Sequence, residues 1–183
     1  MITQDPGAGA TVWLTGLPSA GKSTIAAAVA ARLRAGGRRV AVLDGDEVRR
    51  TVSAGLGFGR ADREENVRRV GGLAEAAARA GAVVLVPVIA PYAACRARVR
   101  RRHEAAGIPY MEIYVATPLE VCAQRDVKGL YARQAAGEIS GLTGVDDPYE
   151  VPAAPDLRLD TSHESPAASA SAVYRLLSAR GLA

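Results

Sequence analysis

The stretch 16-GLPSAGKST-24 lies between an apolar run, 12-VWLT-15, and an Ala-rich segment, 25-IAAAVAARL-33. Its two glycines, its lysine and the serine that follows have the spacing of a phosphate-binding P-loop. The apolar run predicts a strand and the Ala-rich segment a helix, which is the context that this motif requires. The stretch therefore predicts a nucleotide-phosphate site at the seam between a β-strand and an α-helix.

Each residue type in this loop has a physical reason to be there. Gly16 and Gly21 allow a tight turn whose N–H groups point at phosphate oxygens, and the helix N-terminus adds a partial positive charge. Lys22, expected to be an exposed loop side chain, is predicted to bridge the β- and γ-phosphates, and Ser23 to place its hydroxyl on Mg²⁺. Thr24 is structural or a secondary phosphate contact. The alternative is a chance match in a chain rich in Gly and Ala.

Strand and helix patterns alternate along the rest of the chain, which predicts an α/β fold with a doubly wound parallel sheet. Asp62 is expected to be the N-cap of a helix over 62–81. A Gly-rich stretch over about 128–152 is long for a loop and is predicted to be a lid. No linker divides the chain, so residues 1–183 are expected to form one domain. The other strands are expected over 11–16, 39–46, 83–89, 111–117 and 156–161, and the other helices over 22–37, 93–107, 118–126 and 166–180.

Composition limits which compartment and which kinds of partner are expected for the protein. The chain has 183 residues, a net charge of +4 and 4% aromatic residues. Its basic stretches, 60–70 and 96–102, could bind nucleic acid, but bases would have few rings to stack on, so a solvated face or a small anionic ligand is favoured. The longest apolar run, 82–91, is too short to span a bilayer. The first ten residues show no secretory signal and the two cysteines cannot form a disulfide framework, so a cytoplasmic protein without a membrane or nucleic-acid partner is expected.

Two acids follow the second expected strand, in 40-VAVLDGD-46. A carboxylate at the end of a strand beside a P-loop can hold the metal or its waters, which is the role predicted for Asp44. Asp46 is a candidate general base, because a phosphoryl acceptor hydroxyl must lose its proton. The alternative is that Asp44 and Asp46 only form a turn with an N-cap. No N/T-K-x-D stretch follows, so ATP is expected as the donor in preference to GTP.

The stretch 57-GFGRADREENVRRV-70 predicts the acceptor side of the site. Phe58 is the only phenylalanine and lies in a Gly-flanked loop, where a ring beside cations suits stacking on a base with an anion nearby. Arg63 and Asn66 are three residues apart on a helix and so face the same side, and Arg49 could complete a polar clamp with them.

With these motifs the chain resembles the adenylylsulfate kinase (APS kinase) family over nearly its whole length. The resemblance is carried by GLPSAGKST, LDGDEVR (43–49), GFGRADREENVRRV, IAPY (89–92) and, most specifically, TPLEVCAQRDVKGLYARQAAGEISGLTGVDDPYE (117–150). It implies transfer of the γ-phosphate of ATP to the ribose 3′-hydroxyl of adenosine 5′-phosphosulfate (APS), which gives PAPS, the activated sulfate donor. It also suggests a homodimer.

The resemblance implies a role for each matching residue. Phe58 falls on the aromatic that stacks on the APS adenine, Lys128 on a lid lysine near the phosphates, and Arg125 where the ATP adenine packs. Gly141 and Leu142 match the lid tip over the substrate adenine. The residues expected to bind ATP are then Gly16, Ser19, Ala20, Gly21, Lys22, Ser23, Thr24 and Arg125; those expected to bind APS are Asp46, Arg49, Phe58, Arg63, Asn66, Ile89, Ala90, Lys128, Gly141 and Leu142; Lys22 and Asp46 are the expected catalytic residues, and Ser23 and Asp44 hold Mg²⁺, the aspartate directly or through water.

Two residues depart from the family pattern. Where family members commonly carry Ser in I-S-P-Y, this chain has Ala90, so a phosphoserine there is excluded and transfer is expected to be direct. Where the lid often carries Phe, this chain has Leu142, which would make one side of the adenine sandwich aliphatic. These departures keep open a kinase for another small hydroxylated substrate. A nucleotide-sensing module without turnover is the further alternative, although it would require a damaged site.

Overall fold

In the computed structural model, which describes residues 7–183, five parallel strands form one sheet in the order β2-β3-β1-β4-β5. The expectation about a secretory signal falls in part on residues 1–6, outside the described residues. Helices alternate with the strands, so the predicted doubly wound α/β fold is confirmed. The elements are β1 (Ala10–Thr15), α1 (Lys22–Ala35), β2 (Val40–Val42), α2 (Gly45–Arg50), α3 (Arg60–Arg79), β3 (Val83–Pro87), α4 (Ala93–Ala105), β4 (Tyr110–Val115), α5 (Leu119–Arg125), α6 (Leu130–Ala135), β5 (Leu157–Leu159) and α7 (Pro166–Ala179).

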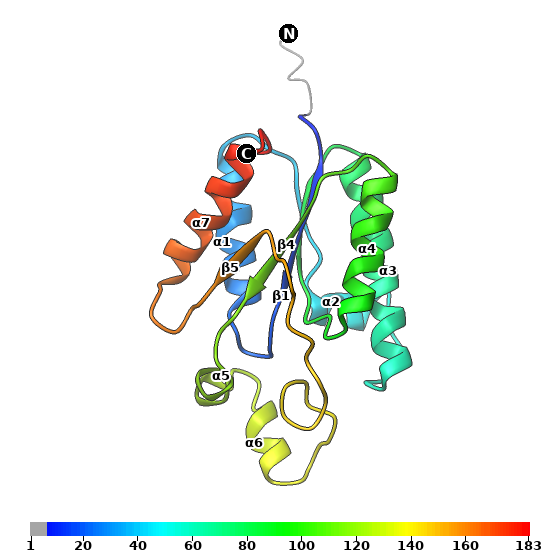
Figure 1. Ribbon diagram of the computed structural model, residues 1–183, viewed down its shortest axis with the longest axis vertical. Helices are drawn as coiled ribbons and strands as arrows, with labels where there is room; N and C mark the ends of the chain where they lie inside the picture. Colours follow the sequence, from blue (N-terminus) through cyan, green and yellow to red (C-terminus); the bar gives the residue numbers. More distant parts are fainter. Residues whose placement is uncertain (1–6) are drawn as a thin grey trace.

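The central strands β3, β1 and β4 are buried along almost their whole length because both faces of the sheet are covered. Successive side chains of a strand point to opposite faces, so Val12 and Leu14 enter one core and Trp13 enters the other. β3 divides in the same way, with Leu85 on the first face and Val86 on the second. Helices α1 and α7 cover the first face, whereas α3 and α4 cover the second (Figure 1).

Because all five strands are parallel, their carboxyl ends meet at one edge of the sheet. The loop between β1 and α1, the helix α2 and the segment carrying α5 and α6 all lie at this edge (Figure 1). An open parallel sheet binds its ligands at this edge, so the fold brings the predicted P-loop and the predicted lid together.

The sequence-based expectations need correction at three helices. Asp62 is not an N-cap: α3 begins at Arg60, after Gly59, and Asp62 lies in the first turn. The short helices α2 and α6 were not expected, because six residues are too few to show a helical period. No helix of residues 7–183 is long and apolar enough to cross a membrane.

Candidate active site

A cavity of about 800 Å³ opens at the carboxyl edge of the sheet. It is bounded by the P-loop, α2, the loop after β3 and the start of the lid, so it brings together residues from both halves of the sequence. The predicted site residues that line it are Ser19, Ala20, Gly21, Lys22, Ser23, Thr24, Asp44, Asp46, Arg49, Phe58, Arg63, Asn66, Ile89, Ala90, Arg125 and Lys128. Gly16, Gly141 and Leu142 are not part of its lining.

The glycines of the P-loop are required by the backbone. Gly21, the N-cap of α1, has a φ of 101°, in the left-handed region that disfavours side chains. Gly16 packs against the end of β4, where an added Cβ would lie 2.4 Å from the Val115 carbonyl oxygen. Gly16 therefore shapes the loop from beneath, while the α1 N-terminus faces the cavity.

Lys22 is buried, contrary to the expectation of an exposed loop lysine. Its ammonium group donates hydrogen bonds to the carbonyl oxygens of Gly16, at 2.9 Å, and Leu17, at 2.7 Å. Burial lowers the pKa of the Lys22 side chain to about 8. The negative charge of a phosphate would strongly stabilise the protonated form of an ammonium group buried in this way.

The first acid after β2, Asp44, both caps α2 and contacts the P-loop. The Asp44 carboxylate caps α2 by accepting a hydrogen bond of 3.0 Å from the Asp46 amide. Its other oxygen accepts a hydrogen bond of 2.6 Å from the Ser23 hydroxyl. The interpretation of the Asp-Gly-Asp stretch as a turn with an N-cap is therefore confirmed for Asp44. Its role at a metal stays a prediction, for which the oxygen atoms of Ser23 and Asp44 lie side by side.

Asp46, one residue into α2, points away from this pair toward the lid. Its carboxylate forms an ion pair with the Lys128 ammonium group, and both side chains are more than half exposed. The lid lysine is thus held at the predicted base, 82 residues away in sequence.

On the acceptor side, Phe58 is the most exposed ring of the site, with 68% of its surface accessible. The Arg49 guanidinium carbon lies 4.4 Å from the ring centroid, and Arg49 also donates a 2.8 Å hydrogen bond to the Gly57 carbonyl. This arrangement fixes the loop before α3 and leaves the ring available for stacking.

Arg63 and Asn66, one turn apart on α3, are both buried but differ in their partners. Arg63 donates hydrogen bonds to the Phe58 carbonyl, the Gly141 carbonyl and the Thr143 hydroxyl, so it ties α3 to the lid. The Asn66 side-chain oxygen has no hydrogen-bond partner among the described residues. An unpaired buried acceptor in a cavity wall suits a donor from a ligand.

The lid tip does not lie where the resemblance implied. Leu142 is buried in the core cluster on the α1 side and does not face Phe58 across the cavity. The Asp146 carboxylate accepts hydrogen bonds from the amides of Gly141, at 2.9 Å, and Leu142, at 2.6 Å, which closes a tight turn. In this structure that turn directs the Leu142 side chain inward, so the expected Phe58–Leu142 sandwich is absent.

Sequence reasoning missed a group of hydroxyls behind the P-loop. The side chains of Thr117 and Thr161 both donate to the Ala20 carbonyl, and Arg125 donates to the Thr161 hydroxyl at 2.8 Å. Each threonine follows a strand, at the carboxyl edge where the site was expected. Position after a strand is the signal in the sequence that indicates these threonines, as it does for Asp44 and Asp46.

Comparisons with known proteins agree with this geometry. Residues 8–160 match the model of the adenylylsulphate kinase family. An adenylyl-sulfate kinase of Myxococcus xanthus (strain DK1622) is 53% identical over 175 residues, which cover 96% of this chain and 94% of that protein.

Solved structures give the same result. An APS kinase of Mycobacterium tuberculosis, in complex with AMPPNP and APS, superposes with a TM-score of 0.92 at 47% identity, covering 94% of this chain and 99% of that one. A hexameric APS kinase from Thiobacillus denitrificans has a TM-score of 0.73 at 37% identity and covers 97% of this chain and 30% of that one.

Proposed function

The chain belongs to the adenylylsulphate kinase family, and we propose that a single cavity seats both of its substrates, with ATP on the P-loop and APS against α2, α3 and the loop after β3. The chain transfers the γ-phosphate of ATP to the 3′-hydroxyl of APS and gives PAPS and ADP. The observation that supports this arrangement is that the P-loop side chains and the predicted acceptor side chains line the same cavity.

On the donor side, Lys22 turns from the Gly16 and Leu17 carbonyls to the β- and γ-phosphates. The amides of the P-loop bind the remaining phosphate oxygens, and Arg125 packs at the adenine of ATP. Because the Lys22 charge is already desolvated, it stabilises the charge that develops on the moving phosphoryl group more than an exposed lysine would. The residues proposed to bind ATP are Gly16, Ser19, Ala20, Gly21, Lys22, Ser23, Thr24 and Arg125.

The Ser23–Asp44 pair fits a magnesium ion that arrives with ATP. Mg²⁺ prefers oxygen ligands and is held by few protein side chains together with phosphates and waters. Within residues 7–183 no three His, Cys, Asp or Glu side chains are grouped to hold a metal unaided, which matches an ion brought by its nucleotide. Ser23 and Asp44 would hold the ion, which would neutralise phosphate charge when bound.

On the acceptor side, Asp46 accepts the proton of the 3′-hydroxyl. Its ion pair with Lys128 breaks when the phosphates draw the lysine toward them, which frees the carboxylate. Phe58 stacks on the APS adenine, and the Asn66 oxygen accepts a hydrogen bond from the substrate. Arg49, Arg63, Ile89 and Ala90 complete this wall, whereas Gly141 and Leu142 reach APS only in a lid arrangement different from the one described.

The wider context is proposed as follows. Residues 1–183 act as one kinase domain in the cytoplasm. The proposed compartment is supported by Cys95 and Cys122, which are buried free thiols. A homodimer is proposed, and sedimentation of the pure protein tests it against the hexamer of the Thiobacillus relative. No nucleic-acid partner is proposed, because arginines of the basic stretches are paired with acids, as in Arg68–Glu65 and Arg102–Glu75.

The test is an acceptor screen with three proteins. Wild-type protein with MgATP should release ADP and form PAPS with APS, and should release far less ADP with a panel of nucleosides and other hydroxyl compounds. Asp46→Asn keeps the shape of the base but not its charge, so kcat should fall by about 10²–10⁴-fold with little change in the KM for ATP. Lys22→Ala should abolish transfer. A folded wild-type protein that prefers another acceptor would overturn the assignment of APS.

A further inference from the structure

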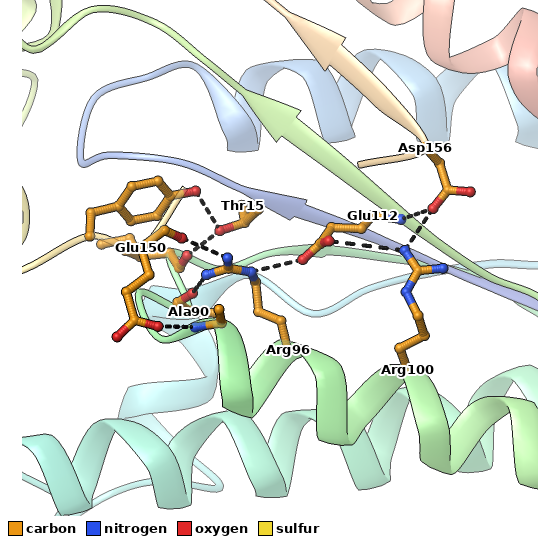
Figure 2. Close-up of polar contacts among 10 residues, drawn as sticks. Thr15, Ala90, Arg96, Arg100, Glu112, Glu150 and Asp156 are labelled. Atoms are coloured by element: carbon orange, nitrogen blue, oxygen red, sulfur yellow. Dashed lines mark hydrogen bonds and ion pairs between the residues drawn. The ribbon is translucent and has the colours of Figure 1, made fainter. Parts of the chain in front are cut away.

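A buried guanidinium, that of Arg96, lies behind the acceptor wall without lining the cavity. Arg96 is in the first turn of α4 and is 3% exposed. Its three nitrogens donate to three separate segments: Nε to the Glu112 carboxylate on β4 at 2.8 Å, Nη1 to the Ala90 carbonyl at 2.7 Å, and Nη2 to the Glu150 carbonyl at 2.6 Å. Figure 2 shows the side chain reaching from the helix to these acceptors.

The segment that Arg96 holds on the acceptor side is strained. Ala90 has a φ of 44°, in the left-handed region that non-glycine residues rarely occupy. Such a conformation persists only when the surrounding structure fixes it, and such residues cluster at ligand sites. The adjacent Ile89 carbonyl is fixed as well, by a 2.5 Å hydrogen bond from the Thr15 hydroxyl.

The segment on the other side is the carboxyl end of the lid. The Glu150 amide donates to the Pro91 carbonyl at 2.8 Å. The Glu150 carboxylate accepts a hydrogen bond of 2.7 Å from the Ala93 amide, which Figure 2 shows. The Tyr149 hydroxyl is 2.9 Å from that of Thr15, the residue before the P-loop. The loop after β3, the carboxyl end of the lid and the end of β1 thus meet around Arg96.

We propose that Arg96 is a positioning residue for the acceptor, which holds the strained Ile89–Ala90 wall and the lid end in one arrangement. It touches neither substrate, and it acts through the Ala90 and Glu150 carbonyls. A planar guanidinium is needed because its donors must satisfy three oxygens in fixed directions, which a lysine ammonium at the end of a flexible stem cannot do. The kinetic part of this inference rests on the proposed function.

The neighbouring Arg100 provides a matched control. It lies one turn later on α4, contacts the same Glu112 at 4.0 Å and the Asp156 carboxylate at 2.8 Å, and forms no hydrogen bond with the acceptor loop or the lid end. A substitution there disturbs the same polar cluster without releasing Ala90 or Glu150.

The test compares Arg96→Met, Arg96→Lys and Arg100→Met in the full chain, with thermal unfolding recorded for each. Both Arg96 variants should raise the KM for APS by at least about tenfold while the KM for ATP changes by less than about twofold. Arg100→Met should leave both constants near wild type. Arg96→Lys keeps a cation beside Glu112, so it serves if the Met variant does not fold.

A second measurement does not depend on the acceptor. Trypsin should cleave after Lys128 and Arg133 several times faster in the Arg96 variants than in Arg100→Met, because the lid end is released. An unchanged KM for APS, unchanged cleavage, or equal effects of Arg100→Met would overturn the role of Arg96. If wild-type protein does not phosphorylate APS, the proposed function fails, and the trypsin comparison still decides the role of Arg96.

Discussion

The Lys22 ammonium group shows how burial prepares a side chain for its ligand. Burial lowers the pKa of Lys22 from 10.5 to about 8. The folded state therefore binds fewer protons than the unfolded chain between these values, so this group contributes stability that increases as the pH rises from about 8 toward 10.5. A bound phosphate should raise the pKa of Lys22, because its negative charge favours the protonated lysine.

ATP binding is therefore expected to take up protons at alkaline pH. At about pH 9 the free protein carries a mostly neutral Lys22, and the complex a charged one, so uptake should approach about one proton. Calorimetry in two buffers with different ionisation enthalpies measures this number. Lys22→Met should remove the uptake. A wild-type value of zero would contradict a Lys22 side chain that is neutral before ATP binds and charged afterwards.

The packing of Leu142 leads to a prediction opposite to the one suggested by the resemblance. A phenylalanine in an aromatic sandwich would tighten APS binding by roughly 0.5–1.5 kcal/mol. Because Leu142 is instead buried in the core cluster, Leu142→Phe should overpack it and lower the free energy of unfolding by roughly 1–3 kcal/mol. Urea unfolding measures the loss, and Val145→Phe, at an exposed lid position, is the control. Tighter APS binding with full stability would show that the lid tip turns toward the substrate.

At the scale of elements, the helix α6 depends on one acid before it. The Asp126 carboxylate accepts hydrogen bonds of 3.0 Å from the amides of both Tyr131 and Ala132. A helix of six residues has little intrinsic stability, so this cap and the hydrogen bond from the Tyr131 hydroxyl to the Pro18 carbonyl anchor the lid to the P-loop.

Removing the cap should loosen the lid selectively. Loss of a cap costs about 1 kcal/mol, so Asp126→Ala should speed hydrogen exchange of the α6 amides by about fivefold. Exchange in β1 and β4 should not change. Glu120→Ala, at an exposed position on α5, controls for loss of a carboxylate. Equal α6 exchange in the two variants would contradict the anchoring role of Asp126.

At the scale of the whole molecule, features formed by residues close together in the sequence could be predicted, whereas contacts between residues far apart in the sequence could not. The existence of five strands and of the long helices follows from local sequence patterns. The second strand is shorter than expected: β2 ends at Val42, and the rest of the expected stretch, 43–46, runs into α2. The P-loop side of the site was also predictable, because its residues are consecutive. The helices α2 and α6 were missed because capping by Asp44 and Asp126, and not periodicity, defines them. Arg96 binds the Glu150 carbonyl from 54 positions away, and no local pattern indicates such a contact.

Asp156 joins the parts of the molecule that sequence patterns treat separately. Its carboxylate accepts hydrogen bonds from Arg100 on α4, at 2.8 Å, from the Glu112 amide on β4, at 2.8 Å, and from Arg180 after α7, at 2.7 Å (Figure 2 shows the first two). Burial alone would raise the pKa of Asp156, but these donors outweigh burial and the pKa is lowered. The charged carboxylate therefore stabilises the packing of helices from both faces around β4.

Asp156→Asn should lower the free energy of unfolding at pH 7 by roughly 1.5–3 kcal/mol, the range for hydrogen bonds to a charged group. Because the folded-state pKa is depressed, this contribution is fully present above the unfolded pKa of about 3.9 and is lost as the pH falls through the folded value. The difference between wild type and variant, measured by urea unfolding, should thus be equal at about pH 7 and pH 5 and smaller near pH 3. Glu138→Gln, which breaks an exposed pair with Arg133, should cost at most about 1 kcal/mol. A difference for Asp156→Asn that stays constant down to pH 3 would mean that the shape of the side chain, and not its charge, holds these elements together.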